Sequence, residues 1–142
     1  MEVEPRLRQA LVAVAGVEAA RDAVADALAY GWAHWERVGA MENPAGYLYR
    51  VARSRVPREV GRAPVVLPVP EPGRMPDIEP GLAGALAQLT ERQRAAVFLV
   101  EGCDWTCPEV AAFLGISVSS VRNHLSRGLG RLRAILEVSV DA

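Results

Sequence analysis

The stretch Thr106–Arg133, TCPEVAAFLGISVSSVRNHLSRGLGRLR, decides the fold of this chain. Thr106 and Glu109 have the spacing of a capping box, and Gly115 ends the short helix that they begin. Ser117 then caps a longer helix, in which apolar residues recur at steps of three or four. A short helix, a tight turn and a longer helix predict a helix-turn-helix. The apolar residues of the longer helix are Val118, Val121, Leu125, Leu129, Leu132 and Leu136.

The outer face of the longer helix carries short polar groups near its start and arginines behind them. Short donors there reach base edges in a major groove, while arginines and the helix N-terminus hold phosphates. The alternative is a plain helical hairpin with a polar surface, but the turn, the caps and the basic face together favour DNA binding. These outward positions are Ser119, Ser120, Arg122, Asn123, Ser126 and Arg127.

The rest of the chain shows helical signals and no strand signal. A capping box at Thr90–Gln93 begins a helix that Gly102 ends, and a short helix over 82–89 precedes it. Three helices are predicted further upstream, over 5–15, 18–38 and 44–55. Asn43 caps the last of them, and Pro57 ends it. In the second helix we expect Val24, Leu28, Trp32 and Trp35 to form one apolar stripe, with both tryptophans in the core.

Seven of the ten prolines fall between Pro57 and Pro80, where no helical or strand period is visible. This composition is typical of an extended linker, which we expect to be the most mobile part. We therefore predict an all-α fold with two small helical domains, residues 1–56 and 81–142, joined by a Pro-rich linker over residues 57–80.

Composition excludes several classes of protein. With 142 residues, 51% of them hydrophobic, and a net charge of −1, the chain is too apolar and too balanced for a disordered tail. No run approaches the length of a membrane span, and the acidic start does not resemble a signal peptide, so we expect a cytoplasmic protein. All the basic residues are arginines, and they gather in two segments. Five arginines stand against one acid in residues 47–64, and four against two in residues 117–142, which suits contact with nucleic acid at two places.

The C-terminal helices resemble region 4 of bacterial RNA polymerase sigma factors, most closely those of the extracytoplasmic-function (ECF) group. The resemblance rests on the following segments: Leu89–Val97, Glu101-Gly102, Glu109–Ala111, Leu114–Ser117, Val121-Arg122, Arg127–Leu129 and Arg131–Arg133. It implies that this unit binds the −35 promoter element and the β flap of the polymerase. The residues implied for reading the −35 element are Ser119, Ser120, Arg122, Asn123, His124 and Arg127.

The upstream half is similar to region 2 of the same group. Asp22–Trp32 matches its run of acidic and apolar residues, and Asn43–Arg53 matches its Asn-Pro-x-x-Trp/Tyr-Leu-Tyr-Arg segment. The resemblance implies that Asp22 and Asp26 dock on the clamp helices of the polymerase β′ subunit. It also implies a role in opening the −10 element and holding the exposed strand, with aromatic and basic groups suited to stacking and phosphate binding. The residues implied for the strand are Tyr47, Tyr49, Arg50 and Arg53.

Region 2 looks reduced in this sequence. A helix that usually precedes Pro5 is absent, Pro57 cuts the last helix short, Ala25 stands where a glutamine is usual, and the loop over 103–108 is longer. Three functions remain open at this point. The first is an ECF-like sigma factor that recruits core RNA polymerase. The second is a sigma-like DNA-binding regulator that cannot initiate by itself, and the third is an interaction protein that binds an anti-sigma factor.

The sequence gives little support for an enzyme or for a metal site. Cys103 and Cys107 lie too far apart in sequence for a typical zinc pair, and two thiols make no disulfide framework. A redox switch is a less favoured alternative to two ordinary thiols. No nucleophile triad, carboxylate pair or Gly-rich phosphate loop stands out. We therefore expect no enzyme, no metal and no cofactor.

Overall fold

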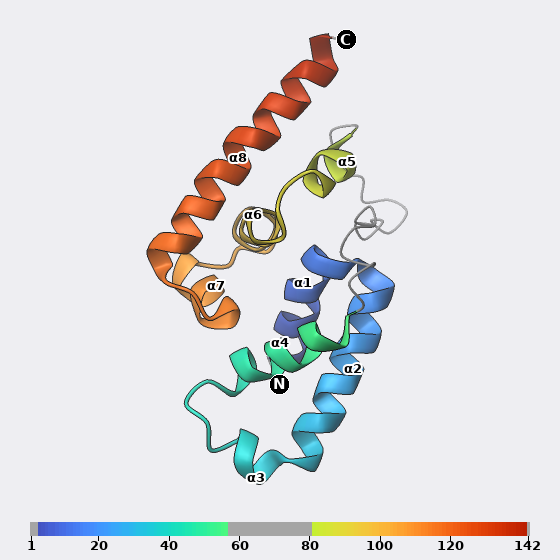
Figure 1. The fold of residues 1–142 in the computed structure, drawn as a ribbon, viewed down its shortest axis with the longest axis vertical. Helices are drawn as coiled ribbons and strands as arrows, with labels where there is room; N and C mark the ends of the chain where they lie inside the picture. Colours follow the sequence, from blue (N-terminus) through green and yellow to red (C-terminus); the bar gives the residue numbers. More distant parts are fainter. Residues whose placement is uncertain (1–2, 57–80, 142) are drawn as a thin grey trace.

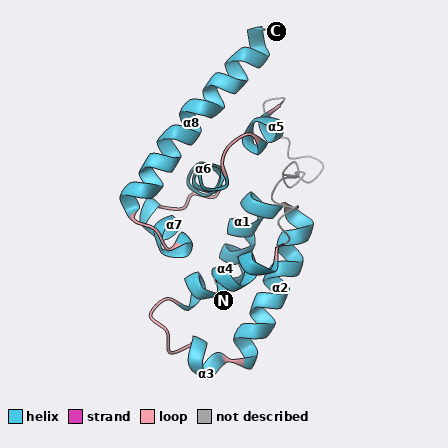
Figure 2. Cartoon of the chain, in the orientation of Figure 1, coloured by secondary structure: helices cyan, strands magenta, loops and turns pink. Residues whose placement is uncertain are grey.

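The protein is helical throughout the part that the structure describes. The computed structural model describes residues 3–56 and 81–141, and no strand occurs among them (Figure 2). The prediction of an all-α fold is confirmed. Within the same ranges, no helix is long and apolar enough to cross a membrane.

Two groups of helices make up the fold (Figure 1). The N-terminal half consists of α1 (Val3–Ala15), α2 (Val17–Ala33), α3 (Trp35–Val38) and α4 (Pro44–Arg55). The C-terminal half consists of α5 (Leu82–Ala87), α6 (Glu91–Val97), a π-helical turn (Phe98–Gly102), α7 (Cys107–Leu114) and α8 (Val118–Asp141).

The predicted helix over 18–38 is interrupted at His34, and the prediction that Trp32 and Trp35 lie in the core is wrong. Their exposed fractions are 85% and 57%. The inward face of α2 instead uses small residues, and it ends at Gly31 against Leu48 of α4. A Cβ atom at Gly31 would lie 2.9 Å from Leu48 Cδ2, so this contact has no room for an indole ring. Gly31 takes the inward position at this end of α2, and both tryptophans lie on exposed faces.

The helix starts predicted from capping residues are confirmed. Asn43 accepts a hydrogen bond from Gly46 N at 3.1 Å, and Thr90 and Gln93 form both bonds of a capping box. The Thr106 hydroxyl accepts a hydrogen bond from Glu109 N at 3.2 Å, and it donates one to the Glu109 carboxylate. That carboxylate therefore does not accept from the Thr106 backbone N–H, and the second bond of a full capping box is missing.

The two halves share one hydrophobic core. α6 lies between α8 and α1, and α7 packs on α4 (Figure 1). Fully buried Leu7 and Leu11 of α1 belong to the same cluster as Leu99 and Val110 of the C-terminal half. A second, smaller cluster lies under α8, between α5 and α6. The predicted linker over 57–80 lies outside the described residues, and the division into two domains stays a prediction.

Candidate nucleic-acid interface

The predicted helix-turn-helix is formed by α7 and α8. Gly115 ends α7 with a φ of 68°, a left-handed conformation that glycine adopts without steric cost. Ser117 begins α8 by accepting a hydrogen bond from Ser120 N at 3.1 Å. Val121 is fully buried, which fixes the face of α8 that points inward.

The opposite face of α8 presents the residues predicted to read DNA. Arg122 and Arg127 are exposed, and neither has an ion-pair partner among the described residues. Ser119 and Asn123 are also exposed, whereas Ser120 and His124 are half-buried. This face therefore offers amide, hydroxyl and guanidinium donors to a ligand without first breaking an ion pair.

A close approach between α8 and α6 positions this face, and sequence analysis missed the residue that permits it. A Cβ atom at Gly128 would lie 2.8 Å from Val97 Cγ2 and 3.2 Å from the carbonyl oxygen of Gln93. A backbone carbonyl cannot move aside as a flexible side chain can, so a larger residue would push α8 away. The available signal was a glycine inside a helix, where alanine is favoured by about 1 kcal/mol.

The residues predicted to hold an opened DNA strand lie on α4 in unlike environments. Arg50 is exposed and Tyr47 is half-buried. Tyr49 is only 6% exposed and packs edge-on against Phe113 of α7, with ring centroids 6.3 Å apart. Burial raises the pKa of Tyr49 to about 12. In this fold Tyr49 is covered and offers no free ring face to a base.

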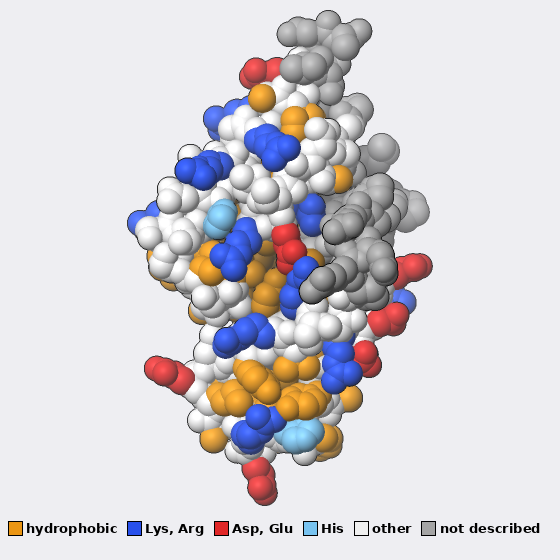
Figure 3. Space-filling view, viewed as in Figure 1, with side chains coloured by type: hydrophobic (Ala, Val, Ile, Leu, Met, Phe, Trp, Pro, Cys, Tyr) orange, Lys and Arg blue, Asp and Glu red, His pale blue; other side chains and the backbone are white. Residues whose placement is uncertain are grey.

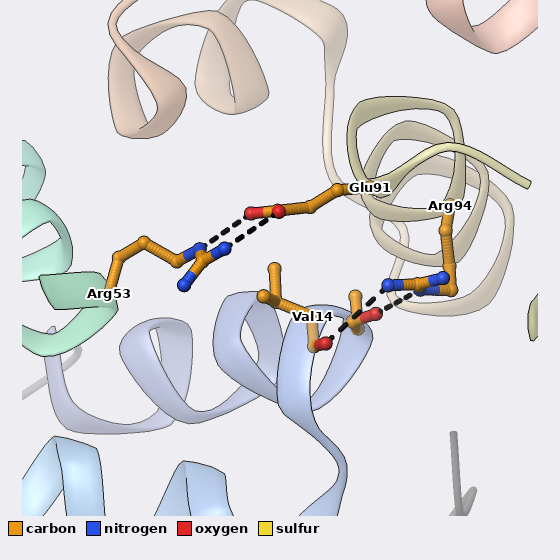
Figure 4. Close-up of polar contacts among 5 residues, drawn as sticks. Val14, Arg53, Glu91 and Arg94 are labelled. Atoms are coloured by element: carbon orange, nitrogen blue, oxygen red, sulfur yellow. Dashed lines mark hydrogen bonds and ion pairs between the residues drawn. The ribbon is translucent and has the colours of Figure 1, made fainter. Parts of the chain in front are cut away.

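Arg53 forms a bidentate ion pair with Glu91 at the start of α6 (Figure 4). Arg53 Nε donates to Glu91 Oε1 at 2.6 Å, and Nη2 donates to Oε2 at 2.8 Å. The hydrogen bond from Arg53 lowers the pKa of Glu91, and the same bond raises the pKa of Arg53. A guanidinium makes the same two-pronged contact with a phosphate.

Arg94 crosses from α6 to the end of α1 (Figure 4). Its Nε donates to the carbonyl oxygen of Ala13 at 2.6 Å, and its Nη2 to that of Val14 at 3.5 Å. These carbonyls belong to the last turn of α1, where they lack partners within the helix and where positive charge is favoured. Arg94 is 4% exposed, and burial lowers its pKa. It therefore serves as a C-cap supplied by the other half of the chain.

Further polar contacts join the two halves. Asn43 Nδ2 donates to the carbonyl oxygen of Ala112 at 2.8 Å, and Trp105 Nε1 donates to Gln9 Oε1 at 2.9 Å. We call these contacts the seam. On the N-terminal side it consists of Gln9, Ala13, Val14, Asn43, Tyr49 and Arg53, and on the C-terminal side of Glu91, Arg94, Trp105, Ala112 and Phe113.

A cleft of about 270 Å³ opens at the edge of the seam. Arg50, Arg53 and Arg92 line it together with Glu91. Figure 3 shows basic side chains spread over the face of the molecule that spans both halves. The arginines of α4 and α6 therefore meet at this edge, with one carboxylate between them.

The exposed face of α2 presents Asp22 and Asp26, the residues predicted to bind polymerase. Ala29 and Trp32 continue the same exposed face toward the end of the helix. An exposed indole on the same helix as two exposed carboxylates is typical of a protein-binding surface, because tryptophan anchors are enriched in such contacts. Sequence analysis missed Trp32 here, since it placed that side chain in the core.

An aromatic cluster surrounds Tyr47 at the same end of the molecule. Tyr30 stacks on His34 with ring centroids 4.3 Å apart, and its hydroxyl lies 3.4 Å from that of Tyr47. The guanidinium of Arg37 lies 5.9 Å from each tyrosine ring. Figure 3 shows apolar side chains gathered here beside a histidine and an arginine. The spacing of Tyr30, His34 and Arg37 by four and three residues was the signal in the sequence.

Neither cysteine is placed for metal chemistry in the described ranges. Cys103 and Cys107 are free and half-buried, and burial raises the pKa of the Cys103 thiol. Among the described residues no three His, Cys, Asp or Glu side chains gather as they would around a metal ion.

Comparisons with known proteins find matches to one family. Residues 82–132 match the family described as Sigma-70, region 4. A solved structure of the sigma factor RpoE from Bartonella quintana, in complex with the anti-sigma factor NepR, is also similar, with 25% identity and a TM-score of 0.66. The match covers 96% of this chain and 93% of that one. No curated protein matches the chain.

Together the two matches support an ECF-type sigma factor. Its helix-turn-helix is the −35 recognition motif of region 4, as the resemblance implied, and its family acts in the regulation of transcription. The structural likeness extends over both halves, so it is not confined to residues 82–132. In this sigma factor the α8 face is open, whereas the α4 face meets the C-terminal half at the seam.

Proposed function

We propose that this sigma factor reads the −35 element with the outer face of α8. The observation that carries the proposal is a row of exposed polar side chains directly opposite the buried Val121. Arg122 and Asn123 are the residue types that make bidentate contacts to guanine and adenine, and Arg127, farther along the helix, holds a phosphate. Ser119, Ser120 and His124 complete the reading face.

The partner on the N-terminal side is core RNA polymerase. We propose that Asp22 and Asp26 dock on the basic clamp helices of the β′ subunit, with Trp32 as an apolar anchor on the same face of α2. Exposed carboxylates steer association and set orientation, while an indole supplies buried area. Region 4 contacts the β flap in this proposal.

The opened −10 strand is the ligand that we propose for α4. Tyr47 and Arg50 lie at the accessible part of this face, and the rings of Tyr30 and His34 extend it. Aromatic faces stack bases and arginines neutralise phosphates on single strands. Tyr49 and Arg53 join this surface when the C-terminal half no longer covers them.

An anti-sigma factor is a further proposed partner. The sigma factor in the matched solved structure is bound to one, and its likeness covers nearly the whole of this chain. We propose that a protein of the same kind binds this chain and controls its access to polymerase.

Selection of binding sites from random duplex DNA by the full chain tests the −35 reader. We expect one enriched sequence for the parent chain. The preference should relax at one or two base positions for Arg122→Ala, because that variant removes one bidentate contact. A pool that shows no enrichment, or an identical preference in both proteins, would contradict the assignment of α8.

The second candidate function is a sigma-like regulator that binds DNA without initiating. Two observations favour keeping it in view: α4 ends at Arg55, and the seam covers part of the α4 face. Transcription with core polymerase separates this candidate from the first.

A further inference from the structure

The cleft at the edge of the seam is lined by more positive charge than its one carboxylate balances. Arg50 and Arg53 of α4 and Arg92 of α6 line it, with Glu91 as its acidic residue. Arg53 and Glu91 neutralise each other through hydrogen bonds of 2.6 and 2.8 Å (Figure 4). The charges of Arg50 and Arg92 stay unbalanced, because neither has an ion-pair partner among the residues that the structure describes.

The walls of the cleft strengthen its attraction for an anion. Tyr49, Ala95 and Leu114 line it beside the arginines. Low-dielectric walls around charges of one sign focus the electric field and raise the local concentration of counter-ions. Burial raises the pKa of Tyr49 to about 12, and the positive charge of Arg92 opposes that rise. The charge of Arg92 therefore acts on the cleft that Tyr49 lines.

The volume of the cleft, about 270 Å³, limits what it holds. Pockets for whole cofactors and drug-sized ligands measure ~300–1,000 Å³. The cleft therefore has room for a phosphate or diphosphate group, but not for a whole nucleotide with its base. A guanidinium binds one phosphate through two parallel hydrogen bonds, so two unbalanced arginines match a ligand with two linked phosphates.

We infer that this cleft is a binding site for the diphosphate group of a small anion, held by Arg50 of α4 and Arg92 of α6. Arg53 and Glu91 keep their ion pair and fix the distance between the two helices. The two binding arginines belong to different halves, so the anion bridges them and stabilises the closed chain, in which the seam is formed. The inference does not rest on the roles proposed for α8 or for the −10 strand.

A diphosphate group has two sources. It reaches the cleft as free inorganic pyrophosphate, or as part of a nucleoside diphosphate whose base stays outside the cleft. The backbone of a DNA strand differs from both, because it offers single phosphates that are separated by sugars and carry one charge each. Pyrophosphate, ADP, inorganic phosphate and an oligo-dT strand therefore serve as the four probes.

The experiment measures the thermal unfolding midpoint of the full chain against the concentration of each probe, at constant ionic strength and without divalent cations. A ligand that binds only the folded chain raises this midpoint once its concentration passes the dissociation constant. We expect half-saturation by pyrophosphate below about 1 mM. Inorganic phosphate should need a concentration at least about tenfold higher, because it reaches only one of the two arginines.

Two variants and a control identify the site. Arg50→Gln and Arg92→Gln should each raise the half-saturating concentration of pyrophosphate by about tenfold, since each loses one charged hydrogen-bonded contact. Both side chains are exposed, so the fold should tolerate these changes. Arg21→Gln alters net charge equally at an exposed position of α2 and should change that concentration by less than about twofold.

The ADP titration separates the two sources of the diphosphate group. Half-saturation by ADP at about the concentration of pyrophosphate identifies a nucleotide as a ligand of the cleft. A much weaker effect of ADP identifies the free diphosphate. Both outcomes support the site, provided that Arg92→Gln weakens the response to whichever probe binds.

Three results would overturn the inference. Equal half-saturation by phosphate and pyrophosphate would show that the cleft does not recognise a diphosphate. Equal losses in Arg21→Gln and Arg92→Gln would reduce the effect to the net charge of the chain. A response to oligo-dT that requires Arg92, with none to pyrophosphate, would assign the cleft to a DNA backbone instead. None of these results affects the −35 reader, which the selection of binding sites tests separately.

Discussion

The two basic surfaces of this sigma factor, on α8 and on α4, differ in what covers them. Arg122 and Arg127 of α8 are exposed and have no ion-pair partner in the described ranges. Arg53 of α4 is bound by Glu91, and Tyr49 beside it is buried. Residue types that look alike in sequence therefore lie in opposite states in the folded chain.

The difference arises because α8 is packed on one face only, whereas α4 is packed on two. α8 uses its inner face for the core and leaves the outer face to solvent. α4 packs on α1 and α2 with one side and on α7 with another, so its polar residues lie at a junction. A surface at such a junction depends on the free energy of the seam, whereas the α8 surface depends only on the local fold.

The largest expected effect comes from breaking the seam at its buried cation. Arg94→Met removes the C-cap of α1 and leaves buried carbonyls without donors, so we expect unfolding to become easier by about 2–3 kcal/mol. Urea denaturation measures this loss. Arg92→Met, two residues away on the same helix and exposed, should cost less than about 0.5 kcal/mol. Equal losses in the two variants would show that Arg94 does not hold the halves together.

Substitutions on the exposed face of α8 should change DNA binding rather than the stability of the fold. Arg122→Ala should lose about 1–3 kcal/mol of discrimination at one base position. Arg127→Ala should weaken binding to all sequences alike and reduce the salt slope by about one. Fluorescence titrations at several salt concentrations measure both effects, with Arg21→Ala as a control of equal charge. If Arg21→Ala matches either variant, the effect is one of net charge and not of α8.

The α2 face should matter for polymerase and not for DNA. Reversing both Asp22 and Asp26 to arginine should weaken binding to core polymerase by about 1–2 kcal/mol, since each exposed pair contributes little and reversal adds repulsion. Titration of core polymerase with labelled protein measures the change. The pair Glu36→Arg and Glu42→Arg alters net charge equally on other exposed positions. Identical binding by the two double variants would remove α2 from the interface.

The smallest effect concerns pH. Because Arg53 lowers the pKa of Glu91, this carboxylate stabilises the closed chain above its unfolded pKa of about 4.3, and the contribution is lost as pH falls through the lower folded pKa. Both side chains are partly exposed, so we expect less than about 1 kcal/mol. Comparing the unfolding free energies of the parent chain and Glu91→Gln at pH 7 and pH 3 isolates this contribution. A difference between the two proteins that is the same at both pH values would contradict it.

The sequence alone was sufficient to predict where a helix starts when a capping residue begins it. Asn43, Thr90, Thr106 and Ser117 act through bonds to atoms within three residues, so their effect is local and readable. The outward face of α8 followed equally from periodicity, because one buried stripe determines the opposite face.

Predictions that depended on contacts between distant segments fared worse. Trp32 and Trp35 fit a helical stripe, but the contact between Gly31 and Leu48 decided the inward face of α2. The roles of Glu91, Arg94 and Gly128 arise from partners on other helices, up to 81 positions away for Arg94 and Ala13. Periodicity within one helix carries no information about such partners.

Run-off transcription with purified core RNA polymerase tests the central claim most directly, on a template that carries the DNA site selected by the chain. The account predicts a transcript that requires the chain and starts at the spacing that a −35 element demands. Arg122→Ala should reduce that transcript on the selected site. A chain that binds the site and core polymerase but yields no transcript above core polymerase alone would contradict the account and leave a DNA-binding regulator in its place.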